Sequence, residues 1–502
     1  MTTPATSETG RQSHGARYMT GAEVRRAFVE FFEARGHREV ASSSLVPHND
    51  PTVLLTTAGM QQMTPYFLGL EVPPAARLCS VQKCFRTVDI DEVGDESHCT
   101  FFFMLGNFSV GDYFKKESLA WTWEFLTEVL GLPADRLHPT VHPDDGDAFA
   151  IWRDVIGLPE ARIGRLADNW WGPVGNSGPN GPDSEVYFDL GEEHGDTGDG
   201  PGDGTRYLEI WNNVFMEFFQ SPDGSRAPLP RQNVDTGMGL ERLTMLMQRA
   251  GSIYDTDLYQ TIIQRAAGLA SVTYGVDEET DRALRVIADH ARSGAFLIAD
   301  GVLPGNEGRS YVLRRILRRA IRHGRKLGLD KPFMAEMAGV VIDQFVADHP
   351  NLKERRSQIK RVLTHEEETF GRMLTAGLQQ FATIVSDPMA KRAASILELY
   401  QLDAVDISKL IRESLLPYFE VGMRASKLFR ESTGAASVAQ NAIRRHIDGL
   451  KLVTHDASLW PGDAENFKKV FSEPISGADA FRLYDTYGFP LDLTIELAKE
   501  AG

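Results

Sequence analysis

The chain has 502 residues, of which 42% are hydrophobic and 25% charged, so it is a globular protein long enough for two to four domains. Its net charge of −17 excludes a general attraction to polyanions, so any contact with RNA must use a local basic patch. The three cysteines, Cys79, Cys84 and Cys99, lack zinc-site spacing, and no apolar run could span a membrane, so we expect free thiols, no zinc, no membrane contact and a cytoplasmic location.

The first segments of the chain predict a tail, a helix and an extended run. Residues 1–16 are small and polar, so we expect a disordered tail. Residues 20–35 place apolar side chains at helical spacing before Gly36, which predicts a helix with a glycine stop. The turn PHNDP at 47–51 precedes TVLLTTAGM, a run with the composition of a strand.

Residues 81–114 read VQKCFRTVDIDEVGDESHCTFFFMLGNFSVGDYF. They predict two antiparallel strands joined by a long acidic loop, with Arg86 on the first strand and His98 and Phe102 on the second. This arrangement suits an adenine nucleotide, because a guanidinium and an imidazole can each bind a phosphate while an aromatic face stacks on the base.

The next segments complete a mixed, mostly antiparallel α/β domain. Residues 118–130 are helical in pattern, and residues 136–235 alternate short strands with loops, notably 172–182 and 191–204. In NVDTGMGLERL a strand end delivers Asp235, and two glycines allow a ligand to approach the backbone closely. A helix to residue 249 then carries Arg242 near its N-terminus, where a triphosphate would be stabilised.

The pattern changes near residue 250, and the second half predicts helices. Helical periodicity covers residues 281–299, 310–327, 332–347 and 353–385. The second of these helices carries a basic stripe of Arg314, Arg318 and Arg322, flanked by Arg315 and Arg319, which is either a solvated face or an RNA-binding surface. Asp289, His290 and Arg292 are interpreted as structural. Residues 388–476 contain no chemical motif.

Residues 81–114 closely resemble motif 2 of class II aminoacyl-tRNA synthetases, in the form found in alanyl-tRNA synthetases, and residues 233–243 resemble motif 3. Residues 44–69 resemble motif 1, with Pro47 or Pro51 as its proline. The resemblance implies an α+β fold: a class II synthetase-like antiparallel sheet flanked by helices, followed by an all-helical domain. The expected domains are the tail at 1–16, a catalytic domain at 17–250, a tRNA-recognition domain at 251–387, a mainly helical insertion at 388–476, and a return to tRNA recognition at 477–502.

The resemblance also implies roles for single residues in an alanine–tRNA ligase that uses ATP and Mg²⁺. Arg86 would stabilise the α-phosphate, His98 and Arg242 would hold the β- and γ-phosphates, and Phe102 would stack on adenine; Arg86 and Arg242 are the expected catalytic residues. The alanine site would contain Trp171, Asn212, Val214, Asp235 and Gly237. A small side chain needs a tight apolar wall, here Trp and Val, and an ammonium group needs a buried carboxylate, here Asp235.

For tRNA(Ala), the resemblance implies contacts from the basic helix and from two residues that read a G·U pair in the acceptor stem. The helix would contribute Arg314, Arg315, Arg318 and Arg322. Asn306 and Asp485 can bond the amino group and the 2′-hydroxyls that the minor groove of an A-form helix exposes.

Two other functions remain open at this point. One is a synthetase-like paralogue that makes an aminoacyl adenylate for another acceptor. The other is a non-catalytic acceptor-stem RNA-binding protein, favoured only by Phe103, which stands where relatives usually have a glutamate near the adenine. Relatives continue past the position of Gly502 into an editing domain with a zinc site and a tail domain, so we expect neither editing nor zinc in this chain.

Overall fold

The computed structural model describes residues 17–47, 53–173, 177–195, 200–202 and 206–373, together with residues 477, 480, 481, 494 and 495. The chain divides into two compact units, Met1–Leu363 and Thr364–Gly502. In the second unit, the described residues are helical. The predicted tail at 1–16 and the predicted insertion at 388–476 lie outside the described residues.

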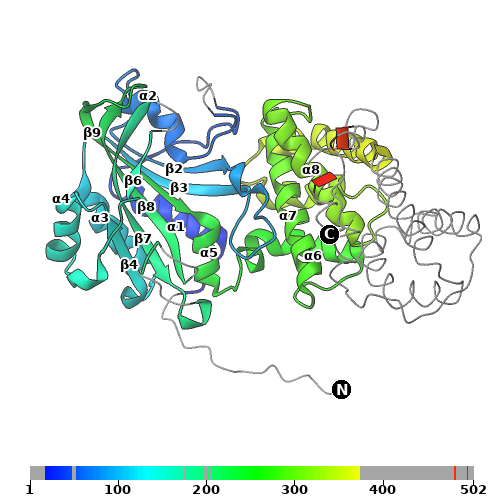
Figure 1. Ribbon diagram of the computed structural model, residues 1–502, viewed down its shortest axis with the longest axis horizontal. Helices are drawn as coiled ribbons and strands as arrows, with labels where there is room; N and C mark the ends of the chain where they lie inside the picture. The colour runs from blue at the N-terminus through cyan, green and yellow to red at the C-terminus, as the bar shows by residue number, and fades with distance from the viewer. Residues whose placement is uncertain are drawn as a thin grey trace, which may run out of the picture. The chain divides into compact units, whose positions relative to one another are not determined.

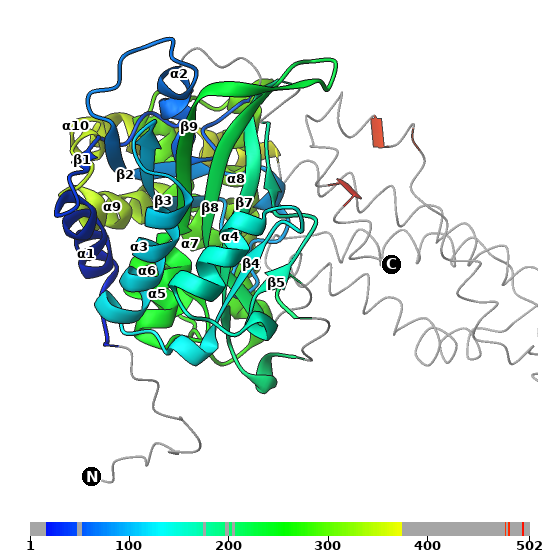
Figure 2. The same ribbon diagram turned by 90° about the vertical axis from the view of Figure 1, so that its left-hand side faces the viewer.

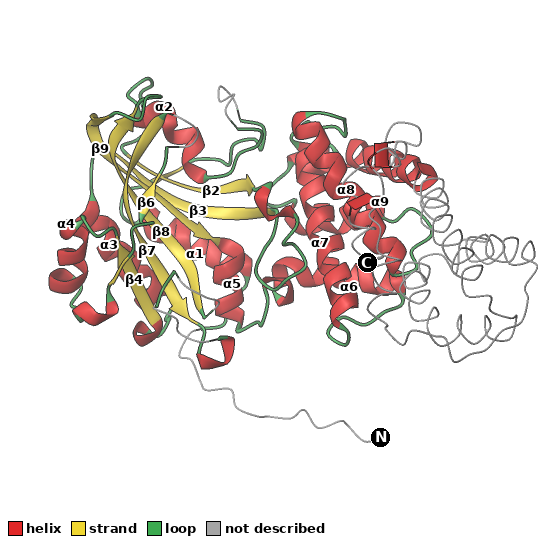
Figure 3. Cartoon of the chain, viewed as in Figure 1, coloured by secondary structure: helices red, strands yellow, loops and turns green. Residues whose placement is uncertain are grey.

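A mostly antiparallel sheet forms the centre of the first half of the first unit (Figures 1 and 3). Its order is β1-β2-β3-β9-β8-β7-β4-β5, with β6 paired to β7. Only the pairs β1–β2 and β4–β5 are parallel. The strands are β1 Arg38–Glu39, β2 Arg77–Phe85, β3 Phe101–Val110, β4 Leu137–Val141, β5 Gly164–Arg165, β6 Trp170–Trp171, β7 Gly178–Asp189, β8 Tyr207–Gln220 and β9 Arg226–Gly239.

Helices cover one face of this sheet (Figure 2). They include α1 (Gly21–Glu33), α3 (Lys115–Glu124) and α5 (Leu240–Gln248), and the short α4 (Gly146–Ala150) lies nearby. The short α2 (Thr64–Phe67) lies on the opposite face, where Phe67 packs in one cluster with Val214 and Met216. The fully buried Trp211 of β8 contacts Phe28 and Phe125, with ring centroids 6.0 and 5.6 Å away. Aromatic side chains bury more area than other residues, so this contact anchors the helices to the sheet.

The second half of the unit is helical, as its periodicity predicts. Its helices are α6 (Asp257–Ala270), α7 (Glu278–Ala299), α8 (Gly308–Lys326), α9 (Met334–Phe345) and α10 (Asn351–Glu354), and residues 356–373 are also helical. Every residue of α7 from 286 to 299 is buried. The helix is therefore the core of this half. Sheet and helices belong to the same compact unit, so the change of pattern at residue 250 falls inside it.

Most predicted elements are confirmed, and three local expectations are wrong. The helix at 20–35 forms with a capping box at Thr20, and Gly36 follows with φ +82°. The run TVLLTTAGM forms no strand in its described part. Its end is a 3₁₀ helix at Gly59–Met63, whose methionines Met60 and Met63 pack onto the sheet face instead of joining an edge.

The other two errors concern glycine-rich sequence inside strands. Part of the loop expected at 172–182 is the start of β7, where a Cβ at Gly181 would lie only 1.9 Å from the carbonyl oxygen of Phe215. Glycine here allows two backbones to approach closely, and it does not mark a loop. The helix expected from residue 236 begins at Leu240, because residues up to Gly239 continue β9.

No helix in the described part of the chain combines the length and apolar composition that a membrane span requires.

Two polar side chains of α7 are tied to the sheet domain. Arg292, fully buried, forms an ion pair with the buried Glu241 of α5, and Glu241 also accepts a bond from the backbone N–H of Phe103 at 3.1 Å. Asp289 accepts bonds from the N–H and the hydroxyl of Thr100, at 3.0 and 2.5 Å. Asp289 and Arg292 therefore have the structural role that the sequence predicts.

We expect Arg292→Leu to lower the free energy of unfolding by about 3–5 kcal/mol, because the buried carboxylate of Glu241 loses its countercharge. Urea unfolding at pH 7 measures this. The control is Arg356→Gln, which removes an exposed pair with Asp343 and should cost at most about 1 kcal/mol. Equal losses in the two variants would contradict the structural role of the buried pair.

Candidate functional site

The strand register brings the predicted alanine-site residues onto one face of the sheet. In an antiparallel pair, opposed residues point to the same side. The β8–β9 register opposes Val214 to Asp235 and Asn212 to Gly237. From β6, the half-buried Trp171 packs against the hydrophobic cluster that contains Val214. The structure thus groups all five residues, and their role as a binding site stays a prediction.

Asp235 is the most unusual of these residues. It is 6% exposed, and no hydrogen bond or ion pair reaches its carboxylate from the described residues. Burial raises its pKa to about 7. A buried carboxylate without a partner is costly, and such groups are commonly found where a ligand supplies the missing charge.

Asn212 supplies a second acceptor beside this carboxylate. Its Nδ2 donates to Asp183 Oδ2 and to Glu185 Oε1, both at 3.3 Å. The two hydrogen bonds hold the amide nitrogen toward the carboxyl groups of Asp183 and Glu185. The oxygen Oδ1 is therefore turned away, and it is buried without a hydrogen-bond partner among the described residues. Asp235 and this oxygen together can accept the hydrogens of an ammonium group.

Sequence reasoning missed Asp183 and Glu185. Both lie on β7, opposite Val214 and Asn212, so they share the face of the site. Burial raises the pKa of each carboxyl to about 7. The sequence Asp-Ser-Glu within a strand could have indicated them, since acidic residues two positions apart on a strand point to the same side.

The predicted nucleotide residues gather beside the predicted alanine-site residues. The guanidinium of Arg86 lies 5.1 Å from the ring centre of Phe102, and its Nε donates to the carbonyl of Thr57 at 3.4 Å. Met104, two residues after Phe102 on β3, has its sulfur 3.0 Å from where a Cβ on Gly237 would lie. Met104 therefore links the predicted nucleotide residues, beside Phe102 on β3, to the predicted alanine-site residues, which include Gly237. The placement of Arg86 differs from the prediction, because Arg86 follows the end of β2 instead of lying on it.

His98 and Arg242 face the same region. His98 precedes β3 in the loop, not on the strand as expected, and its Nδ1 lies 2.5 Å from Asp95 Oδ2. Arg242, in the first turn of α5, donates to the carbonyl of Glu209 at 3.1 Å. Burial raises the pKa of the nearby Asp89, and the charges of Arg86, His98 and Arg242 all act against that shift. Arg86, His98 and Arg242 are therefore all within electrostatic reach of Asp89.

Phe103 does not belong to this group. Successive side chains of a strand alternate between faces, so Phe103 points away from Phe102. Its ring stacks on His349 at 5.2 Å and contacts Phe296 of α7 at 5.8 Å. A residue at this position lies on the reverse face of the sheet, away from the candidate nucleotide site.

The predicted tRNA-binding residues divide into separate environments. Arg314 bonds the side chain of the exposed Asn306, and Arg315 pairs with Asp91 at 2.8 Å. Arg322 is 2% exposed, so the structure does not place it on the basic surface that the sequence predicts. Asp485 lies outside the described residues.

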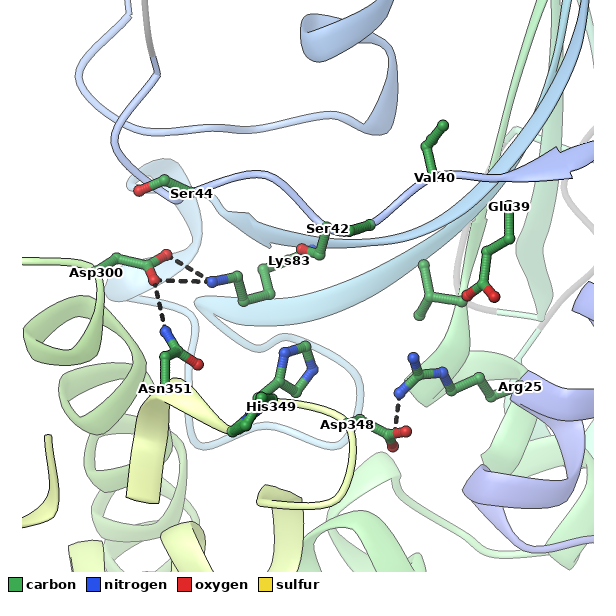
Figure 4. A pocket seen from close by; sticks show the side chains of 13 residues that line it. Arg25, Glu39, Val40, Ser42, Ser44, Lys83, Asp300, Asp348, His349 and Asn351 are labelled. Atoms are coloured by element: carbon green, nitrogen blue, oxygen red, sulfur yellow. Dashed lines mark hydrogen bonds and ion pairs between the residues drawn. The ribbon is translucent and has the colours of Figure 1, made fainter. Parts of the chain in front are cut away.

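A cavity of about 520 Å³ opens on another side of the unit (Figure 4). None of the predicted site residues lines it. Four of its charged side chains form two pairs: Lys83 Nζ lies 2.7 Å from Asp300 Oδ2, and Arg25 Nη1 lies 2.5 Å from Asp348 Oδ2. The Lys83–Asp300 pair joins β2 to the end of α7.

Acidic residues suitable for a magnesium ion stand near the phosphate candidates. Among the described residues, no three His, Cys, Asp or Glu side chains are arranged to hold a metal by themselves. Magnesium bound through nucleotide phosphates needs only one or two carboxylates. Asp89 and Glu209 fit that requirement, because Asp89 is within electrostatic reach of Arg86, His98 and Arg242, and Glu209 lies 3.5 Å from Arg242. The expected lack of zinc stays a prediction.

Comparison with known proteins identifies similar sequences. Residues 23–403 match the family model described as tRNA synthetases class II (A). The alanine–tRNA ligase of Dehalococcoides mccartyi strain BAV1 is 43% identical over 488 residues, which are 96% of this chain and 46% of that protein. The corresponding ligase of Rubrobacter xylanophilus is 52% identical over 388 residues, 74% of this chain and 44% of its own. The chain thus spans about half the length of these curated relatives.

We expect Asp235→Asn to stabilise the unliganded protein above pH 7. The folded pKa of about 7 exceeds the ordinary 3.8, so the folded state holds a proton that the unfolded state releases between these values. The stability contributed by this group therefore falls as pH rises from about 4 to 7. The gain from the substitution grows over the same range, to at most about 4 kcal/mol.

Urea unfolding of the wild type and of Asp235→Asn at pH 5 and pH 8 measures the difference between their free energies of unfolding. If Asp235→Asn is no more stable than the wild type at pH 8, or if its gain in stability is larger at pH 5 than at pH 8, the burial of an unpaired carboxylate at Asp235 is contradicted.

Proposed function

The chain belongs to the family of class II (A) tRNA synthetases, and we propose that it activates alanine with ATP and transfers the alanyl group to the 3′ end of tRNA(Ala). The proposal is favoured by the similarity to alanine–tRNA ligases of several bacteria. The observation that carries the choice of an amino-acid substrate is the buried carboxylate of Asp235, without a partner, beside the buried oxygen of Asn212.

Alanine would bind through its two ends. Its ammonium group would donate to Asp235 and to Oδ1 of Asn212, which supplies the charge that the buried carboxylate lacks. Its methyl group would contact the apolar side chains of Val214 and Trp171, which belong to one packed cluster. Gly237 leaves room for the substrate backbone, because no side chain stands between Asn212 and Met104 there.

In the first reaction step, the alanine carboxylate would attack the α-phosphate of ATP, and pyrophosphate would leave. Arg86 would stabilise the negative charge that develops on the α-phosphate. Arg242 and His98 would hold the β- and γ-phosphates, and Phe102 would stack on the adenine. Asp89 and Glu209 would hold Mg²⁺, which neutralises phosphate charge when bound.

The second step would transfer alanine to the terminal ribose of tRNA. Arg314 and Arg318 of α8 are proposed to contact RNA phosphates, and Asn306, beside Arg314, to read the acceptor stem with Asp485. The tRNA-recognition domain at 251–387 and 477–502 is part of this proposal. We also propose the cytoplasm as the compartment.

The non-catalytic alternative has lost its support. It depended on Phe103 in place of a glutamate near the adenine, and the Phe103 side chain packs on the reverse face of the sheet. The paralogue with another acceptor remains the alternative, and alanine-dependent pyrophosphate exchange without tRNA charging would favour it.

We expect Arg86→Ala to reduce alanine-dependent pyrophosphate exchange by a factor of about 10²–10³, since one charge-stabilising contact in a transition state contributes about 3–4 kcal/mol. The control is Arg153→Ala, which removes exposed ion pairs with Asp154 and Glu160. If exchange by the Arg86 variant stays within about threefold of the control, Arg86 has no place in the mechanism.

We expect the double variant Arg314→Gln, Arg318→Gln to bind tRNA more weakly and with a flatter salt dependence. Each lost phosphate contact lowers the slope of log K against log salt by about 0.7–0.9. Filter binding between 50 and 200 mM salt measures the slope, with Arg153→Gln as the control. An unchanged affinity and slope would identify the stripe as a solvated face.

A further inference from the structure

The loop between β2 and β3, residues 86–100, carries Arg86 and His98, and helix α8 holds its middle. Arg315 Nη2 donates to both carboxylate oxygens of Asp91, at 2.8 and 3.0 Å. Arg319 Nη2 donates to the carbonyl of Val93 at 2.9 Å. The two arginines are four residues apart, so they lie on the same face of α8.

Other helices hold the rest of this loop by its backbone. Arg285 donates to the carbonyls of Gly94 and Asp95 at 3.3 Å. The hydroxyl of Ser252 donates to the carbonyl of Glu96 at 2.8 Å, and the hydroxyl of Tyr254 donates to the carbonyl of His98 at 2.7 Å. These partners all follow residue 250 in the sequence, so the helical half sets the shape of the loop.

A single chain of bonds connects the middle of the loop to its end. Asp289 accepts from the N–H of Thr100, and its other oxygen lies 2.9 Å from Nδ1 of His290. His290 Nε2 lies 3.1 Å from Nη1 of Arg319. Because a guanidinium can only donate, this nitrogen must accept, which requires a neutral imidazole with its proton on Nδ1. Burial lowers the pKa of His290, in agreement with that form.

We propose that Arg319 and Arg315 are positioning residues for adenylate formation: α8, through them, fixes the loop that presents Arg86 and His98 to ATP. The inference rests on the proposed function for the identity of the reaction. Arg319 is the stronger contributor, because it bridges two partly buried partners, whereas the Arg315–Asp91 pair is exposed and worth little by itself.

This role separates Arg315 and Arg319 from the arginines proposed to bind RNA. Consecutive helical positions are about 100° apart, so Arg314 and Arg318 present a different direction from the two that face the loop. The basic stripe that the sequence predicts as one surface is therefore divided: Arg315 and Arg319 contact the loop of residues 86–100, and the half-buried Arg314 and Arg318 point about 100° away from them.

The test is alanine-dependent pyrophosphate exchange without tRNA by wild type, Arg319→Gln and Arg319→Lys. The matched control is Arg325→Gln, which removes an exposed arginine–aspartate pair on the same helix. We expect Arg319→Gln to lower kcat/KM for ATP about tenfold and to leave KM for alanine unchanged, because the alanine site lies on β8 and β9. Arg319→Lys should recover little, since a lysine cannot bridge Val93 and His290. A general loss of folding would not lower kcat/KM for ATP while leaving KM for alanine unchanged.

The pair Arg315–Asp91 permits a double-mutant cycle. Arg315→Gln and Asp91→Asn should each lower kcat/KM for ATP about two- to fivefold. The double variant should lose no more than either one. Losses that multiply would show that the two residues act independently and would remove Arg315 from the proposal.

Hydrogen exchange tests the same inference without reference to activity. The amides of residues 87–99 should exchange faster in Arg319→Gln than in the Arg325 control. Suppose that the wild type catalyses pyrophosphate exchange. The inference is then wrong if Arg319→Gln matches the Arg325 control both in kcat/KM for ATP and in the rate of amide hydrogen exchange in the loop. If wild type shows no alanine-dependent exchange, the proposed function fails, and unchanged amide exchange in the loop would still overturn the positioning role.

Discussion

The buried ion pair between Glu241 and Arg292 is the contact on which the arrangement of the site depends. Glu241 is the neighbour of Arg242 on α5, and its carboxylate also accepts the N–H of Phe103, the neighbour of Phe102. Arg292 lies within 5.1 Å of the ring centres of Phe101, Phe103, Tyr259 and Phe345. These aromatic faces offset part of the cost of burying its charge. One pair thus fixes α5, which carries Arg242, and β3, which carries Phe102, to the centre of the helical half.

The regular elements of this fold could be predicted because their patterns are long. Helices α7, α8 and α9 and the strands β2 and β3 follow from periodicity and from turn residues between them. The errors occur where tertiary contacts decide. TVLLTTAGM has strand composition, but its end coils to place methionines on the sheet face. The glycines at the start of β7 suggest a loop, yet they allow two strands to approach each other.

The site shows the same division. Resemblance to known motifs suffices to name Asp235, Val214 and Asn212, and the register groups them. It cannot indicate that Asp183 and Glu185 orient the amide of Asn212, because that follows from strand pairing. The resemblance also cannot predict which arginines of α8 contact the loop of residues 86–100 and which do not. A helical wheel gives the directions of side chains, but Asp91 and Val93 reach α8 only through the folding of a loop more than two hundred residues earlier in the chain.

That separation in sequence has a consequence for synthesis. Asp91 and Arg315 are 224 residues apart. At roughly 5–20 residues per second, a ribosome makes α8 about 11–45 s after the loop. The sheet strands around the loop can pair during this interval, since β8 and β9 are complete long before α8. During this interval the loop of residues 86–100 lacks the contacts that Arg315 and Arg319 make with it, so it can take its final shape only after the helical half has left the ribosome and folded.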